Sequence, residues 1–283
     1  MIQIPTRQIQ LFAASLMVLV FVQCRKAAPE AVPTGYVAER AMVVSARKEA
    51  SEIGVQILKN GGNAFDAMVA TELALAVAYP FAGNLGGGGF MVYRKANGEI
   101  GSLDYREKAP LAAHKDMYLD SLGNVIPGMS TIGATGTGVP GTVAGIFAIH
   151  DRFGTLPIGD IIQPVINLVE KGVVVTEKQA QRLAKYREQI IEVNGDNTLF
   201  YSECKQGDTL SYPALAETLK RIALHGRDDF YTGETARILA RFIQEKGGYV
   251  TEEDLAKYEA RWRDPIVFTY KDLRIISMSP PSS

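Results

Sequence analysis

The pattern of apolar and polar positions predicts a chain built largely from helices. A first helix is expected between Ser45, a candidate N-cap, and the glycine pair at 61–62, because apolar residues recur on one face between them. Residues 64–78 carry two charged side chains only, so this segment is expected to be a helix buried on nearly all sides. Further helices are predicted over residues 142–152, 158–171, 176–193, 214–224, 234–245 and 251–258.

Two strand-like runs, Phe90–Arg94 and Ile100–Tyr105, lie between these helical segments. The pair Asn97-Gly98 separates them and supplies the positive-φ residues that a two-residue hairpin turn requires. Apolar side chains occupy both faces of the first run, which indicates a strand covered on both sides by helices or by a second sheet. Residues 266–278 repeat the hairpin pattern near the end of the chain.

The predicted turn brings an arginine beside a run of glycines. With Asn97-Gly98 as the loop, Gly89 lies opposite Arg106, next to glycines 86–89. Glycines let a ligand approach the backbone and leave N–H groups for anionic oxygen, and a guanidinium can bind a carboxylate through two parallel hydrogen bonds. This segment therefore predicts a carboxylate-binding pocket. The alternative is a tight turn in which Arg106 pairs with Asp104 or Glu107.

Composition narrows the class of protein. The chain has 283 residues and is 47% hydrophobic, enough for one large domain or two small ones with a substantial core. Its formal net charge of -1 gives no electrostatic footprint for nucleic acid, so no nucleic-acid partner is expected.

The N-terminus has the pattern of an export signal. Residues 9–22 are nearly all apolar, too short for a membrane span and of the length of a secretory signal, so residues 1–24 are interpreted as such a signal. Cys24 follows at the position of a lipoprotein attachment site, which predicts a lipid anchor in the bacterial cell envelope. The alternative is cleavage near residues 27–28 and a soluble periplasmic product. Residues 25–38 are expected to form a tether.

A glycine motif at residues 136–141 matches the dinucleotide fingerprint GxGxxG, with Asp160 at about the distance expected for a ribose contact. No hydrophobic strand precedes the motif, and Pro140 lies within it. We therefore interpret it as a glycine-rich lead into the following helix, and we expect no cofactor.

The acidic and histidine side chains do not form a recognisable catalytic or metal pattern. Asp66 and Glu72 are six residues apart and point to different faces of their helix, which favours capping or packing over paired catalysis. His114, His150 and His225 lie in unrelated segments without a cysteine companion, so no metal site is indicated.

Six segments of the chain together resemble the γ-glutamyltranspeptidase (glutathione hydrolase) family. They are residues 61–67, 83–90, 104–110, 138–145, 247–258 and 277–283. A single glycine run would be weak support, but these segments recur in the order of the family. Residues 39–283 are accordingly identified as a partial domain that corresponds to the N-terminal portion of the large subunit.

This resemblance implies an α+β fold of the N-terminal-nucleophile hydrolase type, an αββα sandwich that is incomplete here. In such proteins a precursor cleaves itself into a large and a small subunit, and the new N-terminal threonine of the small subunit attacks the γ-glutamyl amide. The implied substrates are glutathione and related γ-glutamyl amides, and the implied partner is the small subunit of the same precursor. By resemblance, Arg106 binds the α-carboxylate of the γ-glutamyl donor.

The chain departs from the family pattern because it stops at Ser283, where the family continues. The nucleophilic threonine is expected beyond Ser283, since Thr131, Thr135 and Thr137 are internal and lack a free amine. No catalytic residue is therefore assigned within this chain, which is expected to be inactive alone. Two other functions stay open: a related amide acylase of the same fold, and a catalytically inactive, lipid-anchored binding protein.

Overall fold

The structure is a computed structural model that describes residues 35–196, 198–200 and 202–282. It divides into two units, Met1–Ala41 and Met42–Ser283. The described residues of the first unit, 35–41, form no helix or strand. The predicted export signal and Cys24 lie outside the described residues, as does most of the predicted tether.

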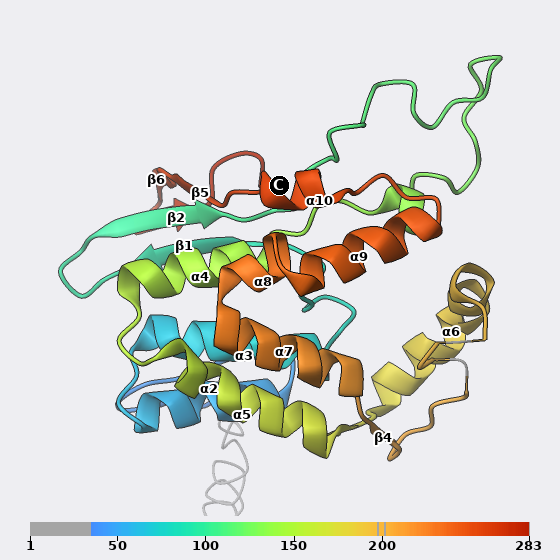
Figure 1. The fold of residues 1–283 in the computed structure, drawn as a ribbon. Helices are drawn as coiled ribbons and strands as arrows, with labels where there is room; N and C mark the ends of the chain where they lie inside the picture. The colour runs from blue at the N-terminus through green and yellow to red at the C-terminus, as the bar shows by residue number, and fades with distance from the viewer. Residues whose placement is uncertain (1–34, 197, 201, 283) are drawn as a thin grey trace, which may run out of the picture. The chain divides into compact units, whose positions relative to one another are not determined.

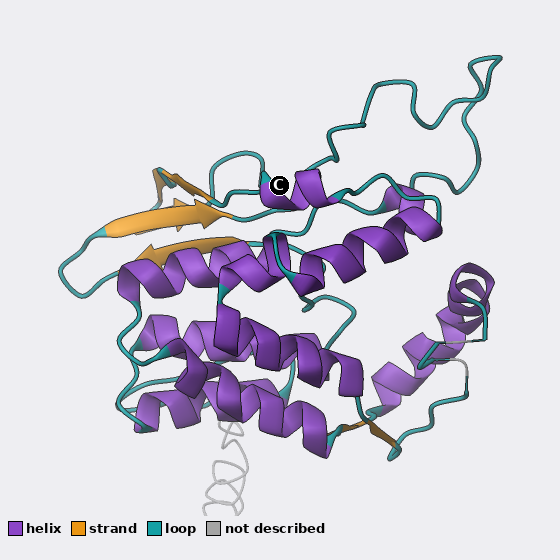
Figure 2. Ribbon diagram, in the orientation of Figure 1, coloured by secondary structure: helices purple, strands orange, loops and turns teal. Residues whose placement is uncertain are grey.

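The second unit mixes helices with short antiparallel sheets, so the predicted α+β class is confirmed (Figure 2). The helices are α2 Lys48–Lys59, α3 Ala64–Ala78, η1 Ala134–Gly136, α4 Thr142–Phe153, α5 Ile158–Lys171, α6 Glu177–Asn194, α7 Pro213–His225, α8 Arg227–Tyr231, α9 Glu234–Glu245 and α10 Glu252–Ala256. The strands are β1 Phe90–Arg94, β2 Ile100–Asp104, β3 Val173–Val174, β4 Thr209–Leu210, β5 Arg261–Arg263, β6 Ile266–Tyr270 and β7 Leu273–Ser277.

Helix α3 is the centre of the hydrophobic core. It is apolar around most of its circumference and contacts α2, α4 and α5, so ten of its fifteen residues are buried. Figure 1 shows the sheet of β1 and β2 lying over α4, with α3 and α7, and then α2 and α5, on the far side of α4. Helices α2, α3, α4, α5 and α7 thus form a body, called the helical body below, that packs against one face of the sheet.

The N-terminus of α3 carries the capping arrangement expected for Asp66. The side chain of Asn63 accepts hydrogen bonds from the amides of Phe65 and Asp66, and Asp66 Oδ2 accepts one from the Asn63 amide at 2.9 Å. Asp66 also accepts from the amide of Thr155, which leads from α4 into α5. The predicted capping role of Asp66 is confirmed.

Ser45 is not the N-cap of α2, contrary to the prediction. Its hydroxyl instead donates to the carbonyl of Arg47 at 2.7 Å and lies 2.8 Å from the Ser51 hydroxyl, and Arg47 occupies the N-cap position. The Arg47 side chain is buried and donates to the Ala78 carbonyl and to Gln179. These tertiary contacts of Arg47 determine where the helix begins.

The loop of the first hairpin is longer by one residue than predicted. Lys95 pairs with Glu99, since the Lys95 amide donates to the Glu99 carbonyl at 2.8 Å. This pairing leaves three residues, 96–98, in the turn. Gly98 takes the positive φ of 89°, whereas the Asn97 side chain accepts from the Glu99 amide at 3.0 Å. The Asn97 side chain thus stabilises a three-residue loop in place of the expected two-residue turn.

This extra loop residue shifts the register by one. Phe90 pairs with Asp104, and Gly89 exchanges backbone hydrogen bonds with Tyr105 rather than with Arg106. The predicted pairing of Gly89 with Arg106 is therefore wrong. Arg106 is the first residue beyond the last paired position of the hairpin.

The sheet has the order β1-β2-β5, and β1 is covered on one face by the residues that the structure describes. Met91, Tyr93 and Leu103 are buried against the helical body, while Val92 on the other face of β1 is 39% exposed. The prediction that both faces of β1 are covered is not met within the described ranges. The second hairpin, β6–β7, forms a separate two-stranded sheet. It also exposes large apolar side chains: Ile266, Val267, Phe268, Tyr270 and Leu273.

No helix in the part of the chain that the structure describes combines the length and the apolar character that a membrane span requires.

Candidate functional site

The glycine run packs directly on the chain segment that contains Arg106. A Cβ atom added to Gly88 would lie 2.5 Å from the Tyr105 carbonyl oxygen, 2.7 Å from the Glu107 amide nitrogen and 2.9 Å from the Arg106 carbonyl carbon. Because these are backbone atoms that cannot rotate away, only glycine fits at this position. The run and Arg106 are therefore neighbours, with Gly88 as the point of contact.

The N-terminus of α4 holds the glycine run in place. The Gly87 carbonyl accepts hydrogen bonds from the amides of Gly141 at 2.8 Å and Thr142 at 3.0 Å. Gly141 is the last residue of the motif at residues 136–141 and the N-cap of α4, and the first residue of the motif, Gly136, ends the 3-10 turn η1. This arrangement agrees with the interpretation of the motif as a lead into a helix.

Two amides of the glycine run remain available for a ligand. Within the described ranges, the N–H groups of Gly86 and Gly88 have no protein acceptor, whereas the Gly89 amide donates to the Tyr105 carbonyl. Exposed main-chain N–H groups in a glycine segment are suited to an anionic oxygen. The run thus provides two of the four donors that its sequence allows.

The guanidinium of Arg106 has no carboxylate partner among the described residues. The side chain is exposed, and Nη1 donates to the Pro281 carbonyl at 2.9 Å. Asp104, one of the two carboxylates expected as alternative partners of Arg106, instead forms an ion pair with Arg263 at 2.8 Å. The hydrogen bond that Asp104 accepts from Arg106 comes from the backbone amide, at 3.1 Å, and not from the guanidinium. The alternative in which Arg106 pairs with Asp104 or Glu107 is not what the structure shows.

A buried tyrosine, Tyr105, contacts a half-buried glutamate, Glu72, and the sequence pattern did not reveal this contact. The Tyr105 hydroxyl donates to Glu72 Oε2 at 3.0 Å, and the ring of Tyr105 packs against Gly89 and Gly145. Burial raises the pKa of Glu72 to about 7, although the hydrogen bond from Tyr105 opposes the rise. Burial, together with the charge of Glu72, also raises the pKa of Tyr105. The signal available in the sequence was that Glu72 is one of only two charged side chains in an otherwise apolar helical segment.

A second tyrosine, Tyr258, contacts Arg106 itself. Its hydroxyl donates to the Arg106 carbonyl at 2.7 Å, across 152 positions of sequence. The two residues lie in different segments of the family resemblance, but nothing in their spacing indicates the hydrogen bond.

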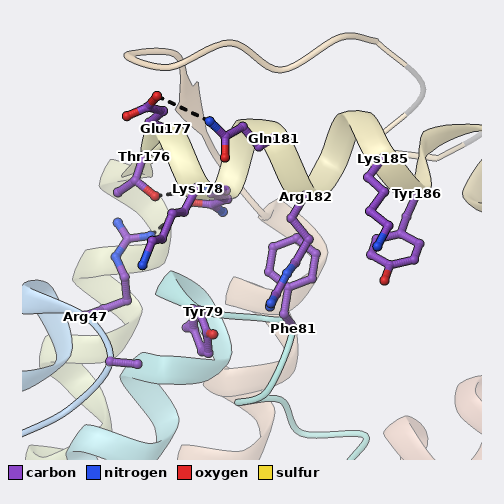
Figure 3. Close-up of a pocket in the computed structure, with 12 residues that line it drawn as sticks. Arg47, Tyr79, Phe81, Thr176, Glu177, Lys178, Gln181, Arg182, Lys185 and Tyr186 are labelled. Atoms are coloured by element: carbon purple, nitrogen blue, oxygen red, sulfur yellow. Dashed lines mark hydrogen bonds between the residues drawn. The ribbon is translucent and has the colours of Figure 1, made fainter.

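Arg106 does not line any of four cavities that described residues of the second unit form. The largest of them, about 720 Å³, lies between the first half of α6 and the residues that follow α3 (Figure 3). Its walls carry exposed cations of α6 and aromatic rings, with Arg182 placed 4.9 Å from the ring centre of Phe81. Its buried cation, Arg47, is already paired with Glu49.

The described residues contain no group of three or more histidine, cysteine, aspartate or glutamate side chains that could hold a metal ion.

Comparison with known proteins decides the family. The model of the gamma-glutamyltranspeptidase family matches residues 50–283. The chain belongs to the gamma-glutamyltranspeptidase family. It is 42% identical over 272 residues to the glutathione hydrolase proenzyme of Escherichia coli (strain K12), which covers 91% of this chain and 47% of that protein. The chain therefore spans about half the length of the curated relatives it matches.

Solved structures of the family agree with this assignment. The gamma-glutamyltranspeptidase of Helicobacter pylori superposes with a TM-score of 0.85 at 43% identity, and the match covers 87% of this chain and 72% of that chain. A cephalosporin acylase from Bacillus halodurans superposes with a TM-score of 0.73 at 26% identity, covering 90% of this chain and 50% of that chain. The fold is thus shared by transpeptidases and at least one acylase.

Proposed function

We propose that this chain is the N-terminal portion of the large subunit of an exported γ-glutamyl hydrolase or transferase. Its substrates are glutathione and related γ-glutamyl amides. The family assignment supports this activity, and the share of its relatives that the chain spans supports the idea that a second subunit contributes to the site. The proposal assigns to this chain the recognition of the donor rather than the chemical step.

In this proposal Arg106 binds the α-carboxylate of the γ-glutamyl donor. One observation carries it: Arg106, whose guanidinium has no carboxylate partner within the described residues, packs through its backbone against a glycine run in which the amides of Gly86 and Gly88 have no protein acceptor. The guanidinium supplies two parallel donors, and the amides supply further donors for the same anion. A free α-carboxylate distinguishes a γ-glutamyl donor from other amides.

The chemical step is assigned to a threonine outside this chain. Its hydroxyl oxygen attacks the carbonyl carbon of the γ-amide while its own amine takes the hydroxyl proton; the C–N bond then breaks, and the leaving amine departs with a proton. Water or an acceptor amine next attacks the γ-glutamyl ester and releases the threonine. Arg106 contributes by holding the acid end of the donor, so the γ-carbonyl is presented to the nucleophile.

Two structural features support a more complete fold in the intact protein. Val92 of β1 is exposed on the opposite face of its strand from the buried Met91 and Tyr93, and large apolar side chains of the separate β6–β7 hairpin are exposed as well. A second sheet and helix layer from the rest of the protein would cover them and complete an αββα sandwich. This covering also supplies the pocket walls around Arg106, which is exposed here.

The test of donor recognition uses the intact gene product, including any sequence that follows Ser283 in frame. Arg106→Ala is expected to weaken donor binding by about 2 to 5 kcal/mol, as for loss of one partner of a hydrogen-bonded charge pair. The Michaelis constant for γ-glutamyl-p-nitroanilide should therefore rise by about 30-fold or more. Arg94→Ala, which removes another exposed arginine of the same hairpin, is the matched control and should leave the constant unchanged.

The same variants separate the transferase from an acylase. Butyryl-p-nitroanilide lacks the α-carboxylate, so Arg106→Ala should not alter its turnover. A Michaelis constant for the γ-glutamyl substrate that is unaffected by Arg106→Ala would remove Arg106 from the donor site.

Export and lipid attachment at Cys24 complete the proposal. The apolar run at residues 9–22 and the cysteine that follows it support it. We expect a membrane-bound product that becomes soluble in Cys24→Ser, measured by fractionation of cells that express the intact gene. A wild-type product that is already soluble, and shorter than a product that begins at Cys24, would count against the lipid anchor. It would favour cleavage near residues 27–28.

A further inference from the structure

The backbone of Arg106 is fixed from three sides. Its amide donates to Asp104 Oδ1 at 3.1 Å, its carbonyl accepts from the Tyr258 hydroxyl at 2.7 Å, and its carbonyl carbon lies against Gly88. Beyond the backbone, the side chain makes one hydrogen bond, to the carbonyl of Pro281. The position from which the guanidinium extends therefore depends on these main-chain contacts.

Tyr258 is itself held rigidly. It is 1% exposed, and its ring stacks on the ring of Tyr231 with centroids 5.6 Å apart and an interplanar angle of 16°. The ammonium of Lys108 lies 4.6 Å from the centre of the same ring. A phenol so enclosed cannot follow Arg106 if the arginine moves, so the hydrogen bond defines where the arginine backbone must be.

The main chain of Tyr258 is anchored as firmly as its ring. Its carbonyl accepts a hydrogen bond from the guanidinium of Arg227, and its amide donates to the Leu255 carbonyl at 3.0 Å. Helix α10, which precedes it, begins with a capping box between Thr251 and Asp254. Tyr258 thus connects Arg106 to helices α8 and α10.

We propose that Tyr258 is a positioning residue for the recognition of the γ-glutamyl donor and that it acts through the backbone of Arg106. This inference rests on the proposed role of Arg106. A bidentate contact between guanidinium and carboxylate tolerates little displacement, and misplacement by about 1 Å is enough to weaken such a contact strongly. Loss of the hydroxyl leaves the Arg106 carbonyl without its buried partner, so the segment can move away from Gly88.

The main experiment compares Tyr258→Phe with Tyr231→Phe in the intact gene product. Both substitutions keep the stacked rings and remove a hydroxyl that donates to a main-chain carbonyl. The Tyr231 hydroxyl donates to the Pro140 carbonyl at 2.9 Å and also accepts from the Ala144 amide at 3.1 Å. Tyr258→Phe should raise the Michaelis constant for γ-glutamyl-p-nitroanilide about tenfold with little change in kcat, equivalent to one hydrogen bond. Tyr231→Phe should leave that constant unchanged while it lowers the melting temperature to a similar extent.

A double variant distinguishes positioning from a general structural effect. If Tyr258 acts through Arg106, Arg106→Ala with Tyr258→Phe should bind the donor no more weakly than Arg106→Ala alone. Turnover of butyryl-p-nitroanilide, which lacks the carboxylate, should be the same in Tyr258→Phe and in the wild type. Additive effects, or an equal loss with the carboxylate-free substrate, would overturn the inference.

A second variant keeps the inference testable if Tyr258→Phe folds poorly. Arg227→Gln removes the guanidinium that holds the Tyr258 carbonyl, and it should raise the Michaelis constant for the γ-glutamyl donor less than Tyr258→Phe and without an effect on the carboxylate-free substrate. If Arg106→Ala raises the Michaelis constant and neither Tyr258→Phe nor Arg227→Gln does, Tyr258 has no positioning role and the proposed function stands. If Arg106→Ala itself has no effect, Arg106 is not part of the donor site, and the proposed role of Arg106 fails together with the inference about Tyr258.

Discussion

The helical body and the exposed side of the sheet differ in how completely their side chains are satisfied. In the body, α3 buries apolar residues on nearly all sides, and its buried carboxylate Asp66 has several donors. On the sheet side, Val92 and the residues of β6–β7 are exposed, and Arg106 lacks a carboxylate partner within the described chain. The difference is what we expect if the body folds around its own core, whereas the sheet side meets the proposed ligand and the proposed second layer.

Leu73→Ala tests the completeness of the body and has the largest expected effect on stability. Leu73 is 1% exposed at the centre of α3, and its truncation should lower the free energy of unfolding by about 2 to 5 kcal/mol through lost burial and a cavity. Chemical denaturation of the chain monitored by circular dichroism measures this change. A loss below about 1 kcal/mol would mean that the core around α3 is loosely packed.

Glu72→Gln tests the half-buried carboxyl of α3, which accepts one hydrogen bond within the described residues, from the Tyr105 hydroxyl. Its pKa is about 7 in the folded chain against an ordinary 4.5, so the folded state binds the proton more tightly. The contribution of Glu72 to stability is therefore complete below about pH 4.5 and decreases as the pH rises through 7. In Glu72→Gln this decrease should vanish, which makes the variant more stable than the wild type at pH 8 by about 1 to 3 kcal/mol.

The control for this measurement is Glu52→Gln, because Glu52 is an exposed carboxylate of α2. Its unfolding curves should follow those of the wild type between pH 4.5 and pH 8. If the free energy of unfolding depended on pH in the same way in Glu72→Gln and in the wild type, the pKa of Glu72 would not be raised in the folded chain. The environment of Glu72 beside Tyr105 would then not disfavour its charged form.

Phe268→Ala tests the exposed sheet side and has the smallest expected effect. Phe268 is 49% exposed in β6, so its truncation should change the free energy of unfolding of this chain by less than about 0.5 kcal/mol, far less than Leu73→Ala. In the intact gene product the cost should exceed about 1 kcal/mol, because the proposed second layer covers this residue. Equal small effects in both proteins would contradict that covering.

The sequence predicted the helices well because their signals are local. Residues 64–78, 158–171 and 234–245 coincide with α3, α5 and α9, since hydrophobic periodicity, caps and glycine ends all lie within each segment. The start of α2 was wrong because tertiary contacts of Arg47 compete with the local capping signal at Ser45. The short strand β5, which pairs with β2, was missed because three residues are too few to show the alternation of apolar and polar positions that predicts a strand.

The candidate site was predicted in its neighbourhood but not in its details. The proximity of the glycine run to Arg106 followed from the hairpin, although the register was wrong by one residue because the Asn97 side chain stabilises a longer loop. The contact of Tyr258 with Arg106 joins residues 152 positions apart in the sequence, so it depends on the tertiary fold. Such long-range contacts leave no periodic trace in one sequence.

The most direct test of the central claim is a crystal structure of the intact gene product with L-glutamate bound. We predict that two nitrogens of the Arg106 guanidinium lie about 2.8 to 3.0 Å from the two oxygens of the α-carboxylate, beside Gly86–Gly89. A glutamate bound with its α-carboxylate on another cation, and with Arg106 still directed at the Pro281 carbonyl, would contradict it.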